Sequence, residues 1–119
     1  MIKILDTTLR EGEQTPGVYF DNHIKLAIAR LVDQIGVDII ETGHPVVSEE
    51  IEHGIRQISS SNLKIRVGAH ARSLKKDVDL ALDCGVNFLG IFFCVSKERL
   101  EGVFNKTLIE AVDQITEVI

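Results

Sequence analysis

Short runs of β-branched and other apolar residues alternate along the chain with longer runs whose apolar residues recur at helical spacing. The short runs predict strands at 2–5, 37–41, 63–70 and 86–93, and the longer runs predict helices at 21–35, 48–58, 73–84 and 105–118, with a short helical turn at 96–100. Strands that alternate with amphipathic helices favour a parallel sheet with right-handed crossovers. The pattern therefore predicts four βα units.

Polar residues and glycines mark the ends of these helices. Residues suited to helix N-termini stand at the start of all four: Asp21, Ser48, Ser73 and Asn105. Glycines that favour a left-handed cap, Gly36 and Gly85, follow the first and third helices. Each glycine is followed directly by a β-branched residue, so helix end and strand start are predicted to coincide.

The same pattern predicts what is buried. Segment 2–5 is expected to be a short buried strand, and the almost wholly apolar segment 86–93 is expected to be covered on both faces. The expected apolar face of the first helix consists of Ile24, Ala27, Ile28, Leu31, Val32 and Ile35, and that of the last consists of Leu108, Ile109, Val112, Ile115 and Val118.

Two architectures fit four βα units in one domain spanning residues 1–119. One is a small doubly wound sheet, and the other is half of a (β/α)8 barrel, which typically needs about 250 residues. A half-barrel leaves two sheet edges and one broad apolar face uncovered, and such edges pair readily with another chain. On that reading we expect the chain to associate with a complementary half, to self-associate, or to be a fragment.

Composition narrows the class of protein. The net charge is −5 with acids and bases interspersed, which gives no electrostatic reason to expect nucleic acid as a partner. No apolar run is long enough to predict a membrane span, and charged residues interrupt any signal-peptide core near the N-terminus. Cys84 and Cys94 lie ten residues apart without a CxxC pattern and are expected to be buried free thiols in a reducing cytoplasm.

Chemistry-bearing side chains gather where the predicted strands end. Segment 6–14 is expected to leave the first strand as a loop. Because ligands bind at the carboxyl ends of parallel strands, we expect one mouth to collect Asp6, Arg10, Glu11, Gln14, Glu41, His44, His70, Arg72, Cys94 and Ser96. His23 and His53 fall on predicted helices and are expected at the surface.

Glu41 ends an apolar strand, where a carboxylate is costly to bury unless it is paired. Arg10 is the nearest partner across adjacent strands. The pair could bind an oxo acid or stabilise an oxyanion, or it could be a structural ion pair. Glu11 could hold a divalent cation, whereas His70 could be a hydrogen-bonded core residue and His44 a loop residue only. From the residues alone these alternatives stay open.

Residues 6–17, DTTLREGEQTPG, closely resemble the signature of the homocitrate synthase, isopropylmalate synthase and citramalate synthase family of the DRE-TIM metallolyase type. The resemblance continues more weakly through the rest of the chain and is closest to homocitrate synthase. It implies a (β/α)8 barrel that condenses acetyl-CoA with a 2-oxo acid by a metal-assisted Claisen reaction, in amino-acid (lysine) biosynthesis.

The resemblance also implies roles for single residues. Arg10 matches the arginine that binds the 2-oxo group and stabilises the oxyanion, and Glu41 the glutamate that pairs with it. Glu11 matches the first ligand of a divalent metal ion (Zn, Mg or Mn), and Gln14 a glutamine that lines the active site. His70 matches the histidine that holds the distal carboxylate of 2-oxoglutarate.

Arg72 and Ser96 are expected at the same substrate pocket, although Arg72 stands at an unusual offset from His70. Glu11 and His70 favour homocitrate synthase over isopropylmalate or citramalate synthase, which remain the alternatives within the enzyme class.

One part of the family pattern is missing. The family completes its metal site with a His-x-His pair on a later strand, and none of the four histidines forms such a pair. The resemblance thus implies the N-terminal (βα)4 half of an acyltransferase barrel, inactive without a C-terminal half. A non-catalytic half-barrel that acts as an assembly subunit is the alternative outside the enzymes.

Overall fold

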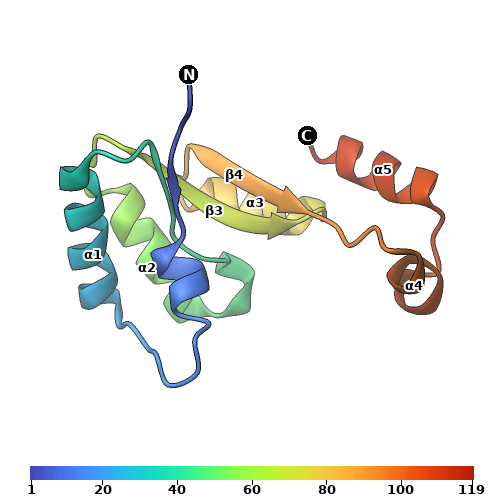
Figure 1. Ribbon diagram of the computed structural model, residues 1–119, viewed down its shortest axis with the longest axis horizontal. Helices are drawn as coiled ribbons and strands as arrows, with labels where there is room; N and C mark the ends of the chain where they lie inside the picture. The colour runs from blue at the N-terminus through green and yellow to red at the C-terminus, as the bar shows by residue number, and fades with distance from the viewer.

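The computed structural model describes residues 1–119 and contains one parallel sheet in the order β1-β2-β3-β4 (Figure 1). The strands are β1 (Leu5–Asp6), β2 (Ile39–Glu41), β3 (Arg66–Arg72) and β4 (Phe88–Phe92). Helices α1 (Asn22–Ile35), α2 (Glu49–Ser59) and α3 (Lys75–Asp83) alternate with the strands and lie on one face of the sheet. Four strands with parallel pairing are confirmed, although β1 shares only Leu5 with the predicted strand at 2–5.

Strand order decides between the two architectures. A doubly wound sheet reverses direction at a switch point, so that its strand order departs from chain order. Here each strand pairs only with its neighbours in sequence, and β1 and β4 form the two edges. The arrangement is that of half a barrel, as predicted.

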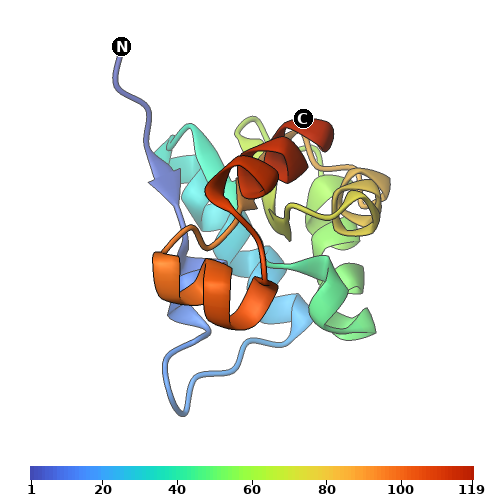
Figure 2. The same cartoon turned by 90° about the vertical axis from the view of Figure 1, so that its right-hand side faces the viewer.

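The remaining elements are short turns and a last helix beyond β4. Turn η1 (Thr8–Gly12) follows β1, and turn η2 (Pro45–Val47) follows β2. After β4 come α4 (Lys97–Arg99), the π-helical turn η3 (Leu100–Phe104) and α5 (Leu108–Glu117), which lie beyond the end of the sheet (Figures 1 and 2). The prediction of a loop at 6–14 was therefore wrong in part, because Thr8–Gly12 forms a π-helical turn. No helix has the length and apolar character needed to cross a membrane.

Two of the predicted N-caps are confirmed and two are wrong. Asp21 accepts a hydrogen bond from the backbone N–H of Ile24, and Ser48 caps α2 in the same way. Ser73 is buried and its side chain does not cap α3. Asn105 ends η3 in a left-handed conformation, and Thr107 caps α5 through a capping box with Glu110.

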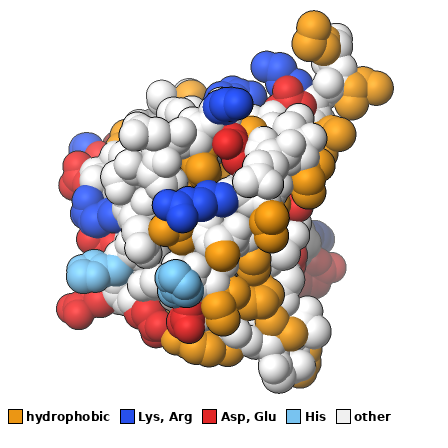
Figure 3. Space-filling view, turned by 90° about the vertical axis from the view of Figure 1, so that its left-hand side faces the viewer, with side chains coloured by type: hydrophobic (Ala, Val, Ile, Leu, Met, Phe, Trp, Pro, Cys, Tyr) orange, Lys and Arg blue, Asp and Glu red, His pale blue; other side chains and the backbone are white.

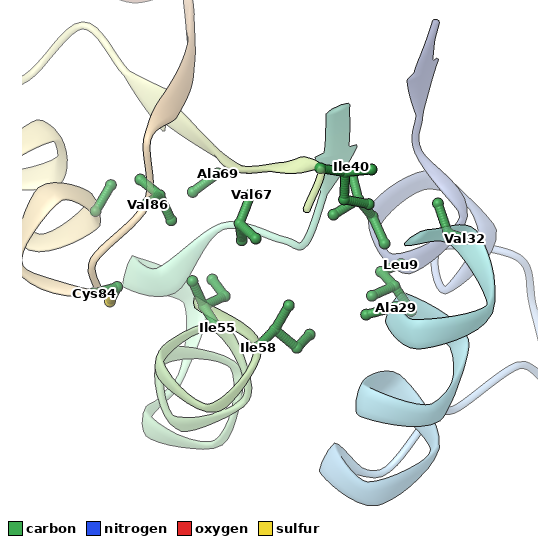
Figure 4. Packing of buried hydrophobic residues seen from close by; sticks show 12 residues of the cluster. Leu9, Ala29, Val32, Ile40, Ile55, Ile58, Val67, Ala69, Cys84 and Val86 are labelled. Atoms are coloured by element: carbon green, nitrogen blue, oxygen red, sulfur yellow. The ribbon is translucent and has the colours of Figure 1, made fainter. Parts of the chain in front are cut away.

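The core lies between the sheet and helices α1 to α3. It is built from β-strand residues that face the helices, such as Ile40, Val67 and Ala69, and from Ile55 and Ile58 of α2 (Figure 4). Leu9 of η1 is fully buried in the same cluster. Alternate residues of β2 and β3 face the other way, so that Glu41 and His70 lie on the sheet face without helices.

Several burial predictions were wrong. Ile2, Ile4 and Leu5 are exposed, because they stand in or just before edge strand β1, which has a neighbour on one side only. Strand β4 is half-buried and is not covered on both faces. The predicted apolar face of α1 is exposed at Ile24, Leu31 and Ile35, and that of α5 at Leu108, Ile109 and Val112.

Many of the exposed apolar side chains therefore lie at the two flanks of the molecule, along β1 and α1 at one side and on α5 at the other. Figure 3, which shows the α1 side, has a band of hydrophobic side chains that starts at the N-terminal strand and continues along one edge of the molecule. The uncovered sheet face is less apolar than predicted, because its carboxyl-terminal half carries charged and histidine side chains.

Candidate functional site

Turn η1 aims the side chains of the signature segment. Both carboxylate oxygens of Asp6 accept hydrogen bonds from Thr8, one from its backbone N–H and one from its hydroxyl. The N–H groups of residues 10–12 all point at the carbonyl oxygen of Thr7, which winds the turn tightly. Leu9 is buried in the core and fixes the turn against the sheet. Arg10 and Glu11, the next residues, are thereby placed at the carboxyl end of β1.

Arg10, Glu41 and His70 meet at this end of the sheet. Nε of Arg10 donates to Oε2 of Glu41 at 2.5 Å, and Nδ1 of His70 lies 3.0 Å from Oε1 of the same carboxylate. Arg10 also donates to Glu11 through Nη1. Glu41 is 3 % exposed, so its charge is balanced almost entirely by these partners. The predicted convergence of Arg10 and Glu41 across adjacent strands is present.

This arrangement fixes the charge of the arginine. Burial lowers the pKa of Arg10, but hydrogen bonding and Coulombic attraction from Glu41 and Glu11 outweigh burial and raise the pKa above its ordinary value. The guanidinium is therefore charged near neutral pH. Its Nη2 group makes no hydrogen bond within the chain and can donate to a ligand.

Strand β4 completes the surroundings of this cluster. The ring of Phe92 stacks on that of His70, with 4.5 Å between centroids and 17° between planes. Gly90 pairs with His70 in the sheet register, and a Cβ at this position would lie 3.3 Å from both Oε1 of Glu41 and Nδ1 of His70. The glycine thus leaves the room that the Glu41–His70 contact needs.

A second polar cluster surrounds Asp77, which is fully buried near the start of α3. Arg72 donates two hydrogen bonds to the Asp77 carboxylate, from Nε to Oδ2 at 2.6 Å and from Nη2 to Oδ1 at 3.1 Å. Nε2 of His44 lies 3.4 Å from Oδ2. Arg72, expected at the substrate pocket, is therefore tied to a buried carboxylate.

Burial and these partners act on the pKa values in opposite ways. Burial alone would raise the pKa of Asp77, but the hydrogen bonds from Arg72 and His44 outweigh it and the pKa is lowered. For His44, burial dominates over the attraction of Asp77, and the pKa of the imidazole falls below its ordinary value.

A cavity of about 390 Å³ lies between η1, the start of α1 and the loop after β2. Arg10, Gln14 and His44 line it, as do Tyr19 and Ser48. Arg10 and Gln14, both predicted site residues, therefore line the same cavity.

Lys25 closes the wall of this cavity. It is 3 % exposed, and its Nζ lies 2.8 Å from Oε2 of Glu13. The other oxygen of Glu13 accepts a hydrogen bond from the N–H of Phe20. Glu13 thus ties the segment after η1 to α1.

The other predicted positions lie apart from the Arg10–Glu41–His70 cluster. Ser96 is exposed and accepts a hydrogen bond from the N–H of Arg99, which caps α4. Cys94 is a free thiol, but the prediction that it is buried was wrong, because it follows the exposed end of edge strand β4. It lines a second, mainly apolar cavity of about 330 Å³ with Phe92 and Phe104. Cys84 is a buried free thiol, and His23 and His53 are exposed, as predicted.

The chain by itself offers no complete metal centre. No three side chains of His, Cys, Asp or Glu are grouped closely enough to hold a metal ion. Glu11 supplies one carboxylate, which is hydrogen-bonded to Arg10. One carboxylate is too few ligands for a divalent cation.

Sequence reasoning did not find Asp77, Gly90, Phe92 or Lys25. Asp77 and Lys25 stand on helices, where a charged residue normally faces solvent. For Gly90, the signal was present in the sequence: a glycine in the middle of an apolar strand often marks a close approach of another group.

Comparison with known proteins bears on the whole chain. The family model described as HMGL-like matches residues 1–119. A homocitrate synthase of Pyrococcus abyssi is 46 % identical over 116 residues, which is 98 % of this chain and 32 % of the relative. A 2-isopropylmalate synthase of Methanocaldococcus jannaschii is 41 % identical over 99 % of this chain and 23 % of its own length. A putative (R)-citramalate synthase of Methanothermobacter thermautotrophicus is 40 % identical over 98 % of this chain and 23 % of its own. The chain thus spans a third or less of these curated relatives.

Proposed function

The chain belongs to the HMGL-like family, and from this premise we propose that it is the first part of an enzyme that condenses acetyl-CoA with a 2-oxo acid. The 2-oxo acid is 2-oxoglutarate and the product is homocitrate. The names of the relatives support this reaction class, and the half-barrel fold fits a chain that spans a third or less of their length.

The observation that carries the proposal is the sharing of Glu41 between Arg10 and His70. A buried carboxylate with one partner would be explained as a structural ion pair. Glu41 instead orients two donors that both lie at the carboxyl end of the sheet, where ligands of parallel α/β proteins bind. It is therefore proposed as a residue that prepares a site for an anionic substrate.

Arg10 has the role of stabilising the oxygen that becomes negative during condensation. Its Nε and Nη1 groups are held by Glu41 and Glu11, so that the direction of the free Nη2 group is fixed before the substrate arrives. A donor that needs no reorganisation is the arrangement that stabilises a developing alkoxide most effectively. Gln14, on the wall of the adjoining cavity, contributes amide groups for substrate binding.

His70 is proposed to recognise the distal carboxylate of the substrate. Its ring is fixed by the stack on Phe92 and by Glu41, and this leaves Nε2 as the ring nitrogen that can face a ligand. Because Nδ1–H donates to Glu41, Nε2 donates to a ligand when the ring is protonated. An imidazolium at this place favours 2-oxoglutarate, with two carboxylates, over 2-oxoisovalerate or pyruvate, with one each. Arg72 and Ser96 have less support as substrate ligands, because each is engaged elsewhere.

Glu11 is proposed as one ligand of a divalent cation such as Zn²⁺, Mg²⁺ or Mn²⁺. Since residues 1–119 do not fit such an ion by themselves, the other ligands have to come from a complementary part of the barrel.

The experiment is a reconstitution. The purified chain is assayed for release of the CoA thiol from acetyl-CoA, alone and after mixing with the segment of the 46 %-identical homocitrate synthase that the chain does not span. We expect no turnover by the chain alone and metal-dependent turnover by the mixture, called the reconstituted enzyme below, with 2-oxoglutarate preferred over 2-oxoisovalerate and pyruvate. Turnover by the chain alone contradicts the need for a second half, and a preference for either monocarboxylic acid contradicts the substrate.

A non-catalytic assembly subunit is the second candidate. The exposed apolar residues at both flanks of the sheet favour association with some partner, whether or not the complex is an enzyme. Light scattering of the chain with and without the complementary segment shows whether the two associate, as both candidates require. The turnover assay of the mixture then separates the candidates, because an assembly subunit binds that segment but yields no turnover.

A further inference from the structure

We propose that His44, held in place by the buried Asp77–Arg72 pair, is a second histidine that contacts the 2-oxo acid beside His70. This rests on the function proposed above. It makes Asp77 a positioning residue, which acts through His44, and it moves Arg72 from a substrate ligand to a support of Asp77.

His44 lies between the cavity lined by Arg10 and the ring of His70. It lines the same cavity as Arg10 and Gln14, and its ring centroid lies 6.2 Å from that of His70, edge to face. Both histidine rings also pack against Phe92. A ligand in this cavity can therefore contact both Arg10 and His44, and His70 lies directly beside His44.

Asp77 orients the ring of His44. Its Nε2 faces Asp77, which as a carboxylate only accepts hydrogen bonds. Nδ1 makes no hydrogen bond within the chain, so it is the nitrogen left for a ligand. Fixing one ring nitrogen with a buried carboxylate is a common way to set the orientation and tautomer of a working histidine.

Asp77 does not need His44 as a partner. Arg72 alone already neutralises Asp77 with two hydrogen bonds. A partner for Asp77 is therefore not the reason for a histidine in the loop after β2, and an apolar side chain would fill the same space without the cost of burying a polar ring. In the free chain, burial keeps the pKa of the His44 imidazole low despite Asp77. A carboxylate ligand at Nδ1 explains the histidine, because its negative charge adds to that of Asp77 and favours the imidazolium that donates to it.

The test uses the reconstituted enzyme and the variants H44Q, D77N and the double variant. The matched control is D79N, which removes an exposed carboxylate from the same helix, where Asp79 pairs only with Lys75. Loss of one hydrogen bond to a charged group predicts a KM for 2-oxoglutarate raised about tenfold in H44Q. The KM for acetyl-CoA and the kcat are expected to stay within about twofold, and D79N is expected to behave as wild type.

Asp77 is tested by coupling. If it acts through His44, D77N raises the same KM and the double variant is no worse than H44Q alone. Additive losses in the double variant, or an unchanged KM in H44Q, overturn the inference. If D77N does not fold by circular dichroism, H44Q, which changes a partly exposed loop residue, decides alone. Wild-type enzyme that condenses none of the three oxo acids overturns the proposed function itself, a result that is read before any variant is made.

Discussion

Oε1 of Glu41 and Nδ1 of His70 lie 3.0 Å apart on adjacent strands β2 and β3, and the other oxygen of the carboxylate holds Arg10. The two donors approach Glu41 from neighbouring βα units on either side of β2. The carboxylate therefore joins three units of the sheet at the edge where ligands bind.

The substitution Glu41→Gln tests this relationship. The amide keeps the size of the side chain but offers one acceptor where Arg10 and His70 need two, so at least one of them loses its orientation. We expect the kcat of the reconstituted enzyme to fall by about 100-fold, the usual loss when a preorganised oxyanion donor is disturbed. Glu49→Gln, an exposed carboxylate on α2, is the matched control. A Glu41→Gln enzyme with more than half of wild-type kcat would contradict the assigned role.

Gly90→Ala tests the space beside the same pair. The added Cβ would lie 3.3 Å from both Glu41 and His70, so one of the two side chains has to move. We expect the free energy of unfolding to fall by about 1–2 kcal/mol, as for other overpacked sites, and the KM for the oxo acid to rise. Gly102→Ala is the control, because a Cβ there meets nothing within 4 Å. Urea unfolding of the two variants gives the comparison, and equal stabilities would show that Gly90 is not needed for room.

The pKa of His44 predicts a pH dependence of stability. Burial lowers this pKa in the folded state, whereas the unfolded chain keeps the ordinary histidine pKa of about 6.5. As pH falls below about 6.5, the unfolded chain therefore binds more protons than the folded chain. The contribution of His44 to stability is thus present above that pH and is lost as pH falls toward the folded pKa. We expect the free energy of unfolding of His44→Asn to fall less steeply than that of the wild type between about pH 7 and 5. His23→Asn, at an exposed position on α1, should leave the decline unchanged.

Some local hydrogen bonds were predicted from sequence, although only two of the four predicted N-caps are present. Asp21 and Ser48 cap their helices as predicted, because a cap needs only a suitable side chain three residues before its target N–H. The meeting of Arg10 and Glu41 was also predicted, because parallel pairing of consecutive strands places their carboxyl ends side by side. Both inferences use short-range geometry that the chain order determines.

Burial was predicted less well, because it depends on neighbours that a residue's own hydropathy does not reveal. Ile2 and Leu31 are apolar and exposed, since each lies at a flank of the sheet with nothing packed against it. Asp77 is charged and fully buried, since the ends of β2 and β3 supply His44 and Arg72 above it. Neither outcome follows from the periodicity of the segment in which the residue stands.

The buried ion pair of Lys25 and Glu13 gives the last prediction. Nζ of Lys25 lies 2.8 Å from Oε2 of Glu13, and the lysine side chain is nearly inaccessible while the glutamate is partly exposed. Glu13 also accepts the N–H of Phe20, so this pair closes the segment that carries Arg10 and Gln14 against α1.

Lys25→Met keeps the aliphatic stem but leaves Glu13 without its cation. Because Glu13 is only partly exposed, its carboxylate stays largely shielded from water once its cation is removed. We expect a loss of about 1–3 kcal/mol in the free energy of unfolding, the range for an unsatisfied polar partner. Lys75→Met removes an exposed i,i+4 pair with Asp79 and is expected to cost less than about 0.5 kcal/mol. If the loss in Lys25→Met comes from the stranded carboxylate, the double variant with Glu13→Gln recovers part of it in urea unfolding. A double variant as unstable as the sum of the two single ones would show instead that the lysine acts through its packing.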